Sequence, residues 1–154
     1  MEKAAPTSRP ISSIDIIKNE KIKYNQSITI CNSKLQEVYH YSREFITQID
    51  YKLLSVKINI PFTGNDSAGK RSRVILYVDK EPICDGSMYN QVYWELKPLQ
   101  LEGICLNVKA GYHKIKLMCC VDGGNLNIPH YNCSLIENTV KPEIFGKIII
   151  IGQN

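Results

Sequence analysis

The sequence lacks the segments that carry a chain into or across a membrane. Its first ten residues, MEKAAPTSRP, are polar and include two prolines, so they do not form the apolar core of a secretory signal peptide. No apolar run approaches the ~20 residues that a membrane-spanning helix needs, and residues 148–151 (IIII) suffice only for a strand. We therefore expect no membrane span and, if Met1 is the natural start, a cytoplasmic protein by default.

An excess of charge of one sign is also missing. The 19 Lys and Arg residues face 15 Asp and Glu residues, which leaves a net charge of +4, and the two signs are interspersed. The densest basic run, residues 70–73 (KRSR), is short. Domains that bind nucleic acids concentrate Lys and Arg on one face. The charge pattern therefore predicts that nucleic acid is not a partner.

The six cysteines do not follow the close, regular spacing of a small disulfide scaffold. A chain of 154 residues buries enough surface to fold without covalent links. Cys119 and Cys120 are adjacent in an expected strand, so they face opposite sides and do not pair easily. We expect free, mostly buried thiols. The alternative is a zinc site that joins one of these two cysteines to His130 and Cys133, although no C-x-x-C pair supports it.

Catalytic and nucleotide-binding motifs are absent or incomplete. Residues 64–70 (GNDSAGK) match the start of a phosphate-binding loop, but Arg71 follows where the motif requires Ser or Thr to hold magnesium. A strand pattern comes next, whereas a phosphate-binding loop leads into a helix. No G-x-S-x-G nucleophile motif occurs. The sequence therefore predicts that the chain is not an enzyme and uses no cofactor.

The remaining titratable residues have simple structural explanations. His113 follows a glycine turn at the start of an expected strand, where we expect a hydrogen-bonded structural histidine. Asp79, Glu81 and Asp85 are placed in turns, where carboxylates bond to backbone amides. Calcium at these turns is an alternative, but no dense carboxylate loop supports it.

What the sequence does contain is strand patterning. In residues 53–62 (LLSVKINIPF), apolar residues occupy every second position from Leu54 to Ile60, which predicts a strand with one buried side that ends at Pro61. Only in residues 33–44 does a helix compete with a strand, and a long loop is expected over 129–143. The expected strands are 27–31, 44–49, 53–62, 73–79, 83–84, 92–96, 99–108, 112–121, 126–128 and 147–151.

This series of short strands predicts an all-β domain, built as a two-sheet antiparallel β-sandwich. We place the domain at residues 14–154 and expect a flexible tail over residues 1–13. Residues 147–151 end in an uninterrupted apolar run over 148–151, so we expect them to form a central strand.

Three segments in order, RVILYVDKEPICDG, LNVKAGYHKIKLMCCVDGG and GKIIIIG, resemble the C1q/tumour-necrosis-factor-like jelly roll, in the form found in bacteriophage tail and fibre proteins. The likeness covers roughly residues 44–151 and consists of strand patterns and glycine turns, without a catalytic motif. The resemblance implies a ten-strand jelly roll that forms compact homotrimers and binds another molecule. The cysteines and the loop over 129–143 are not part of the family pattern.

Together these features favour a non-catalytic interaction or assembly module, a homotrimer that binds a protein or glycan partner. Candidate residues for the partner surface are Tyr93, Trp94, Tyr112 and Tyr131. Tyr93 and Trp94 are neighbours on an expected strand, so their side chains point to opposite faces. The alternative is a monomeric carbohydrate-binding β-sandwich with aromatic residues gathered on one concave face. A metal-assisted enzyme on a β-sandwich is the third hypothesis.

Overall fold

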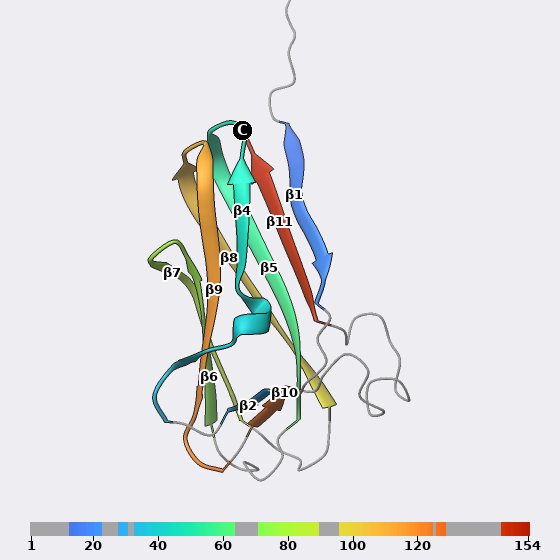
Figure 1. The fold of residues 1–154 in the computed structure, drawn as a ribbon, viewed down its shortest axis with the longest axis vertical. Helices are drawn as coiled ribbons and strands as arrows, with labels where there is room; N and C mark the ends of the chain where they lie inside the picture. Colours follow the sequence, from blue (N-terminus) through green and yellow to red (C-terminus); the bar gives the residue numbers. More distant parts are fainter. Residues whose placement is uncertain are drawn as a thin grey trace, which may run out of the picture.

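The computed structural model describes residues 13–22, 28–30, 33–63, 71–89, 96–124, 126–128 and 146–154. Two antiparallel sheets pack face to face as a β-sandwich of the jelly-roll type, which confirms the predicted fold class (Figure 1). The described elements are β1 Ile14–Lys21, β2 Ile28–Ile30, β3 Gln36–Glu37, the 3-10 turn η1 Tyr39–Tyr41, β4 Arg43–Thr47, β5 Tyr51–Thr63, β6 Arg71–Val78, β7 Glu81–Tyr89, β8 Leu96–Val108, β9 Gly111–Val121, β10 Leu126–Ile128 and β11 Lys147–Gln153.

The first sheet, called sheet A here, is built around β5. On one edge of β5 lies β11, followed by β1, and β8 pairs along the whole of the other edge. Along the same edge of β5, beyond the first residue of β11, the short strands β10 and β2 extend the sheet. The position of β11 between β1 and β5 confirms the prediction that the apolar run near the C-terminus forms a central strand.

The second sheet, sheet B, is built around β9. Strand β6 pairs along one edge of β9 and is followed by β7, while β3 and β4 pair one after the other along the opposite edge. The predicted β6–β7 hairpin is present, with a turn at Asp79 and Lys80. Strand β7 runs on to Tyr89, so the prediction that Asp85 lies in a turn is wrong: Asp85 pairs with Ile75 inside the sheet.

The core lies between the two sheets and follows the predicted alternation. Strand β5 contributes four side chains with no exposed surface, at every second position from Leu54 to Ile60. Burial of one such side chain stabilises the fold by about 1.5–3 kcal/mol relative to leaving it in water. The facing residues of sheet B that are also fully buried are Val74, Leu76, Ile115, Leu117 and Cys119.

Pro61 does not end its strand, contrary to the prediction, because β5 continues to Thr63. Strand β11 pairs with β5 only as far as Asn59, and β10 pairs with it only at Thr63. On the other edge Pro98 lies directly opposite Pro61. No described neighbour therefore needs the N–H group that proline lacks.

Strand β1 was not among the predicted strands, because its alternation is interrupted. The register against β11 shifts between Ile16 and Lys18, so a bulge at Ile17 breaks the period of two. In residues 33–44, where helix and strand competed, the structure has both: β3, then the turn η1, then the start of β4. The predicted strand over 92–96 lies almost entirely outside the described residues.

Four cysteines fall in the described part of the chain, and all four are free thiols, as predicted. Cys119 and Cys120 are buried, and Cys84 and Cys105 are half-buried. The other two cysteines and His130 lie outside the described residues, as do the loop over 129–143 and the phosphate-loop-like segment 64–70. No helix in the described ranges is both long enough and apolar enough to span a membrane.

Candidate functional site

A cluster of polar contacts lies where three turns meet at one end of the sandwich. The turns are residues 48–50 between β4 and β5, residues 79–80 between β6 and β7, and residues 109–110 between β8 and β9. Asp50 accepts a hydrogen bond from the backbone N–H of Ala110 at 2.7 Å, which joins the first turn to the third. This contact is the main reason why the pKa of Asp50 lies below its usual range.

His113 joins the second turn to the third. Its Nδ1 lies 2.9 Å from Asp79 Oδ2, and its Nε2 lies 2.7 Å from the carbonyl oxygen of Lys109. Both partners only accept hydrogen bonds, so both ring nitrogens carry a proton when the two bonds are formed together. When the ring donates both hydrogen bonds, it is an imidazolium cation and has no free lone pair with which to act as a base.

The pKa of His113 is raised. Partial burial is the largest single effect and acts to lower it, but the bonds to Asp79 and to the Lys109 carbonyl, with the charge of Asp79, outweigh burial. The side chain is 12% exposed, and the ring of Phe45 stacks on it at a centroid distance of 5.4 Å. His113 is therefore the hydrogen-bonded structural histidine that the sequence predicted.

Asp79 is positioned for this contact by its backbone. Its φ of 56° is left-handed, a conformation that Asp tolerates better than most residues and that suits a tight hairpin turn. Its second carboxylate oxygen accepts a hydrogen bond from the backbone N–H of Lys114 at 3.0 Å. The prediction that this carboxylate bonds to a backbone amide in a turn is confirmed for Asp79.

A groove of about 860 Å³ opens beside His113, between the β6–β7 turn and the end of β8. Ile104 and Leu106 project from β8 into its lining and are 55% and 66% exposed. Burial, together with the charges of Asp79 and Glu81, raises the pKa of the Cys105 thiol, so the reactive thiolate is disfavoured there. The full lining is Val78, Asp79, Lys80, Glu81, Pro82, Ile83, Ile104, Cys105, Leu106, Asn107, Val108, Lys109 and His113.

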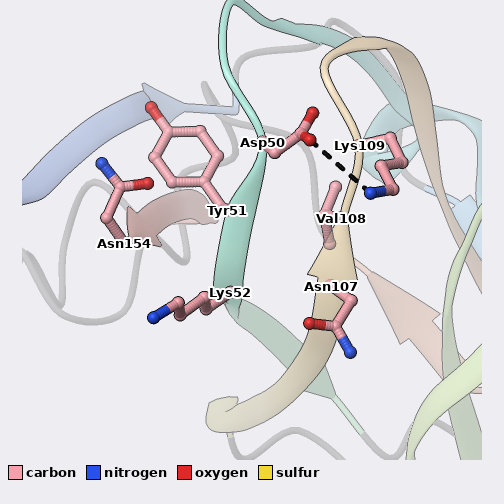
Figure 2. Close-up of a pocket in the computed structure, with 7 residues that line it drawn as sticks. All are labelled: Asp50, Tyr51, Lys52, Asn107, Val108, Lys109 and Asn154. Carbon is pink, nitrogen blue, oxygen red and sulfur yellow. Dashed lines mark ion pairs between the residues drawn. The ribbon is translucent and has the colours of Figure 1, made fainter.

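A smaller pocket of about 400 Å³ lies on the other side of the same strand end. Figure 2 shows its lining: Asp50, Tyr51, Lys52, Asn107, Val108, Lys109 and Asn154. The ammonium group of Lys109 lies 3.6 Å from Asp50 Oδ2, and the dashed line in Figure 2 marks this ion pair. Residues 107–109 line both hollows, so the end of β8 forms the wall between them.

The backbone conformation of Asn107 explains how residues at the end of β8 line both hollows. Asn107 has a left-handed φ of 56°, which interrupts the regular alternation of β8. Leu106 is therefore exposed, while Val108, two residues further on, is only 8% exposed and joins the core.

Of the predicted partner-surface residues, the structure describes Tyr112 alone, because Tyr93, Trp94 and Tyr131 lie outside the described residues. Tyr112 is 60% exposed on β9 and pairs across the strands with Ile46, which is equally exposed. A hydrogen bond to Glu44 raises the pKa of its hydroxyl. Tyr112 lines neither hollow described above.

The sequence analysis missed the exposed pair Ile104 and Leu106. The signal was present: in the run ICL, residues 104–106, apolar residues occupy both alternating faces of a strand. One of these faces has to lie outside the core.

No protein-family profile matches this sequence, and neither does any curated protein sequence. Solved structures do share the fold. A CocE/NonD family hydrolase from Staphylococcus aureus is similar with a TM-score of 0.52 and 10% identity, over 92% of this chain and 37% of its own. Dimeric latent PorU from Porphyromonas gingivalis is similar with a TM-score of 0.50 and 13% identity, over 93% of this chain and 13% of its own.

A carbohydrate-binding module of Cellvibrio mixtus lichenase 5A, in complex with cellotriose, is also similar, with a TM-score of 0.37 and 9% identity over 88% of this chain and 97% of the module. At these identities the likenesses show the fold alone. The jelly-roll part of the resemblance is thus confirmed, and the C1q/tumour-necrosis-factor family is not shown.

The prediction that the chain is not an enzyme is contradicted by these comparisons. A similar β-sandwich forms part of a hydrolase, and this chain spans only 37% of that hydrolase and 13% of PorU. A β-sandwich therefore occurs as one part of an enzyme, and the motifs missing from this sequence do not decide whether this chain is one.

Proposed function

We propose that this β-sandwich is an interaction and assembly module that associates with further copies of itself and binds a protein or glycan partner. The observation that carries the proposal is the exposure of four large apolar side chains on the two outer strands of sheet A. On β1, Ile14 and Ile16 are 65% and 69% exposed, and on β8, Ile104 and Leu106 are 55% and 66% exposed.

The free energy available from covering these side chains is substantial. Full burial of an Ile or Leu side chain stabilises by about 1.5–3 kcal/mol, so covering four that are more than half exposed contributes on the order of 3–6 kcal/mol per subunit. The contributions of two subunits together exceed the lower estimates of the free-energy cost of association, which range over about 4–15 kcal/mol. Large exposed apolar side chains gathered on one surface mark interaction sites on soluble proteins.

For the partner we propose the part of the groove beside His113 that the β6–β7 turn lines, because a second copy covers Ile104 and Leu106. The volume of the whole groove, about 860 Å³, falls in the range of ligand sites, and apolar side chains alternate there with a few charged ones. Three of the charged groups in the lining are already paired: His113 with Asp79, and Lys109 with Asp50. A partner with apolar and uncharged polar groups therefore suits it better than a strongly charged one.

We propose three copies in the assembly, from the resemblance of the strand pattern to the C1q/tumour-necrosis-factor-like jelly roll. Light scattering after size exclusion tests this directly, in the presence and absence of reductant. We expect a mass about three times 17.5 kDa that does not depend on reductant. A monomer at all concentrations would overturn self-association, and a glycan array would then test the sandwich as a lone sugar-binding module.

A further inference from the structure

The four exposed side chains lie on one face of sheet A, in two rows that cross the strands. The first row runs from β1 to β8 through Ile16, Ile151, Ser55 and Ile104. The second row runs in the same direction through Ile14, Gln153, Leu53 and Leu106. Residues directly opposite each other on antiparallel strands project to the same side, so each row presents its side chains together.

This face is the outer one. Leu54 and Val56, on either side of Ser55 in β5, have no exposed surface and belong to the core. Neighbouring residues of a strand point to opposite sides, so Leu53 and Ser55 point away from the core. We call the eight residues of the two rows the outer patch of sheet A. Figure 1 shows the four strands that carry the patch, β1, β11, β5 and β8.

The outer patch has the size of the apolar centre of a subunit interface. Four strands spaced ~4.8 Å apart span roughly 19 Å, and two rows ~7 Å apart with their side chains cover roughly 15–20 Å along the strands, which gives about 300–400 Å². A stable interface takes about 800 Å² from each partner and combines an apolar centre with a polar rim. The patch thus supplies the centre, and its surroundings have to supply the rim.

The surroundings of the patch are mostly polar. The next row along the strands is Asn19, Ile149, Lys57 and Glu102. Lys57 and Glu102 are opposite each other across β5 and β8, so the row carries one positive and one negative charge side by side. At the other end, Lys52, Asn107 and Asn154 line the small pocket (Figure 2). The rim residues named here carry two positive charges and one negative charge, so a second copy meets a net charge of only one unit on this rim.

We propose that the outer patch of sheet A is the surface against which a second copy of this chain packs, with the side chains of β1 and β8 at the centre of the contact. This rests on the self-association proposed above and assigns it to one face. A charged or highly specific foreign partner is a poorer fit, since the centre of the patch holds only isoleucine, leucine, one serine and one glutamine.

The test compares three single substitutions by light scattering and sedimentation velocity. Ile16→Glu and Ile104→Glu place a charge in the patch, one on each outer strand. Ile46→Glu is the matched control, because Ile46 is 60% exposed on the outer face of sheet B, away from the patch. All three side chains are more than half exposed, so the fold should tolerate the charge, and circular dichroism checks that it does.

We expect both patch variants to fall to the 17.5 kDa monomer at concentrations where the wild type and the Ile46→Glu variant remain associated. The assignment is overturned if the wild type is associated and both patch variants keep its mass, or if the control dissociates as they do. In either case the subunits associate through another surface. A monomeric wild type overturns the self-association and its assignment together. If one patch variant fails to fold, Leu106→Glu replaces it, with the same outcomes.

Discussion

The hydroxyl of Tyr51 donates a hydrogen bond of 2.7 Å to Asp15 Oδ2, and this bond ties the first residues of β5 to the outer strand β1. The Tyr51 ring reaches Asp15 across Gly152 of β11, and it is buried, with 6% of its surface exposed. The bond holds β1 in line with the rest of sheet A. The outer patch depends on this alignment, because half of its exposed side chains come from β1.

Removal of the Tyr51 hydroxyl should destabilise the fold without changing its shape. In Tyr51→Phe the carboxylate of Asp15 loses its partner, and hydrogen bonds to charged groups contribute about 1.5–3 kcal/mol. We expect the free energy of unfolding, measured in urea, to fall by about 1–2 kcal/mol. Tyr112→Phe is the control, since Tyr112 is 60% exposed and its loss should cost less. Equal losses in the two variants would contradict the structural role of Tyr51.

A side chain at position 152 should collide with the Tyr51 ring. A Cβ there would lie 2.6 Å from Tyr51 Cε1, closer than carbon atoms approach in folded proteins. We expect Gly152→Ala to lower the free energy of unfolding by about 1–3 kcal/mol, the usual cost of overpacking. The measurement is again a urea titration. If the urea concentration at the midpoint of unfolding is unchanged, the Tyr51 ring can move away from β11 without cost, which would contradict the close packing described here.

The period-two pattern predicted the strands that have one regular buried side, such as β5 and β9, and the apolar run over 148–151 predicted the central place of β11. The pattern failed at β1, where the bulge at Ile17 interrupts the alternation. The left-handed Asn107 reverses the direction of the side chains that follow it in β8, which the predicted strand over 99–108 did not anticipate. Local alternation carries no information on such departures.

The candidate site was less accessible to sequence reasoning than the fold. The network around His113 joins Asp79 and Lys109, which are 34 and 4 residues away in the chain, and nothing in the local sequence couples the two turns. The outer patch likewise draws on four strands whose order in the sheet no sequence pattern fixes. The apolar run over 104–106 carried a signal for part of it, but no prediction was made from that run.

The pH dependence of stability should carry the signature of His113. Its pKa is raised by folding, so its contribution is fully present below the unfolded value of about 6.5 and is lost as the pH rises through the folded pKa. We expect the difference in unfolding free energy between the wild type and His113→Gln to be largest at low pH. His40, whose pKa is lowered, acts with the opposite sign but cancels in this difference.

Urea titrations of both proteins between about pH 5 and pH 9 measure this difference, with pH values chosen around the ordinary histidine pKa. A difference that stays constant, or that grows with rising pH, would contradict the double hydrogen bond of the imidazolium.

The cysteines should react in an order set by their burial. Cys119 has no exposed surface, and burial, with a smaller contribution from Cys120, raises its pKa from 9.0 to about 12. This leaves roughly a thousandfold less thiolate at neutral pH than a thiol with an ordinary pKa has. In native alkylation followed by peptide mass spectrometry, we expect the half-buried Cys84 and Cys105 to be modified before Cys119.

Repeating the alkylation in urea provides the control, because unfolding removes the protection and should make the rates of the three thiols similar. Equal rates in the native protein would mean that the core around Cys119 opens as readily as the surface of the sheets.

The central claim, that this sandwich assembles with copies of itself, is tested most directly by its solution mass in a dilution series, measured by sedimentation velocity with reductant present. Reductant excludes association through intermolecular disulfides, so a higher mass reports on the covered surface alone. The account predicts a single species of about three times 17.5 kDa that dissociates only on dilution. A species of 17.5 kDa at every concentration would contradict it.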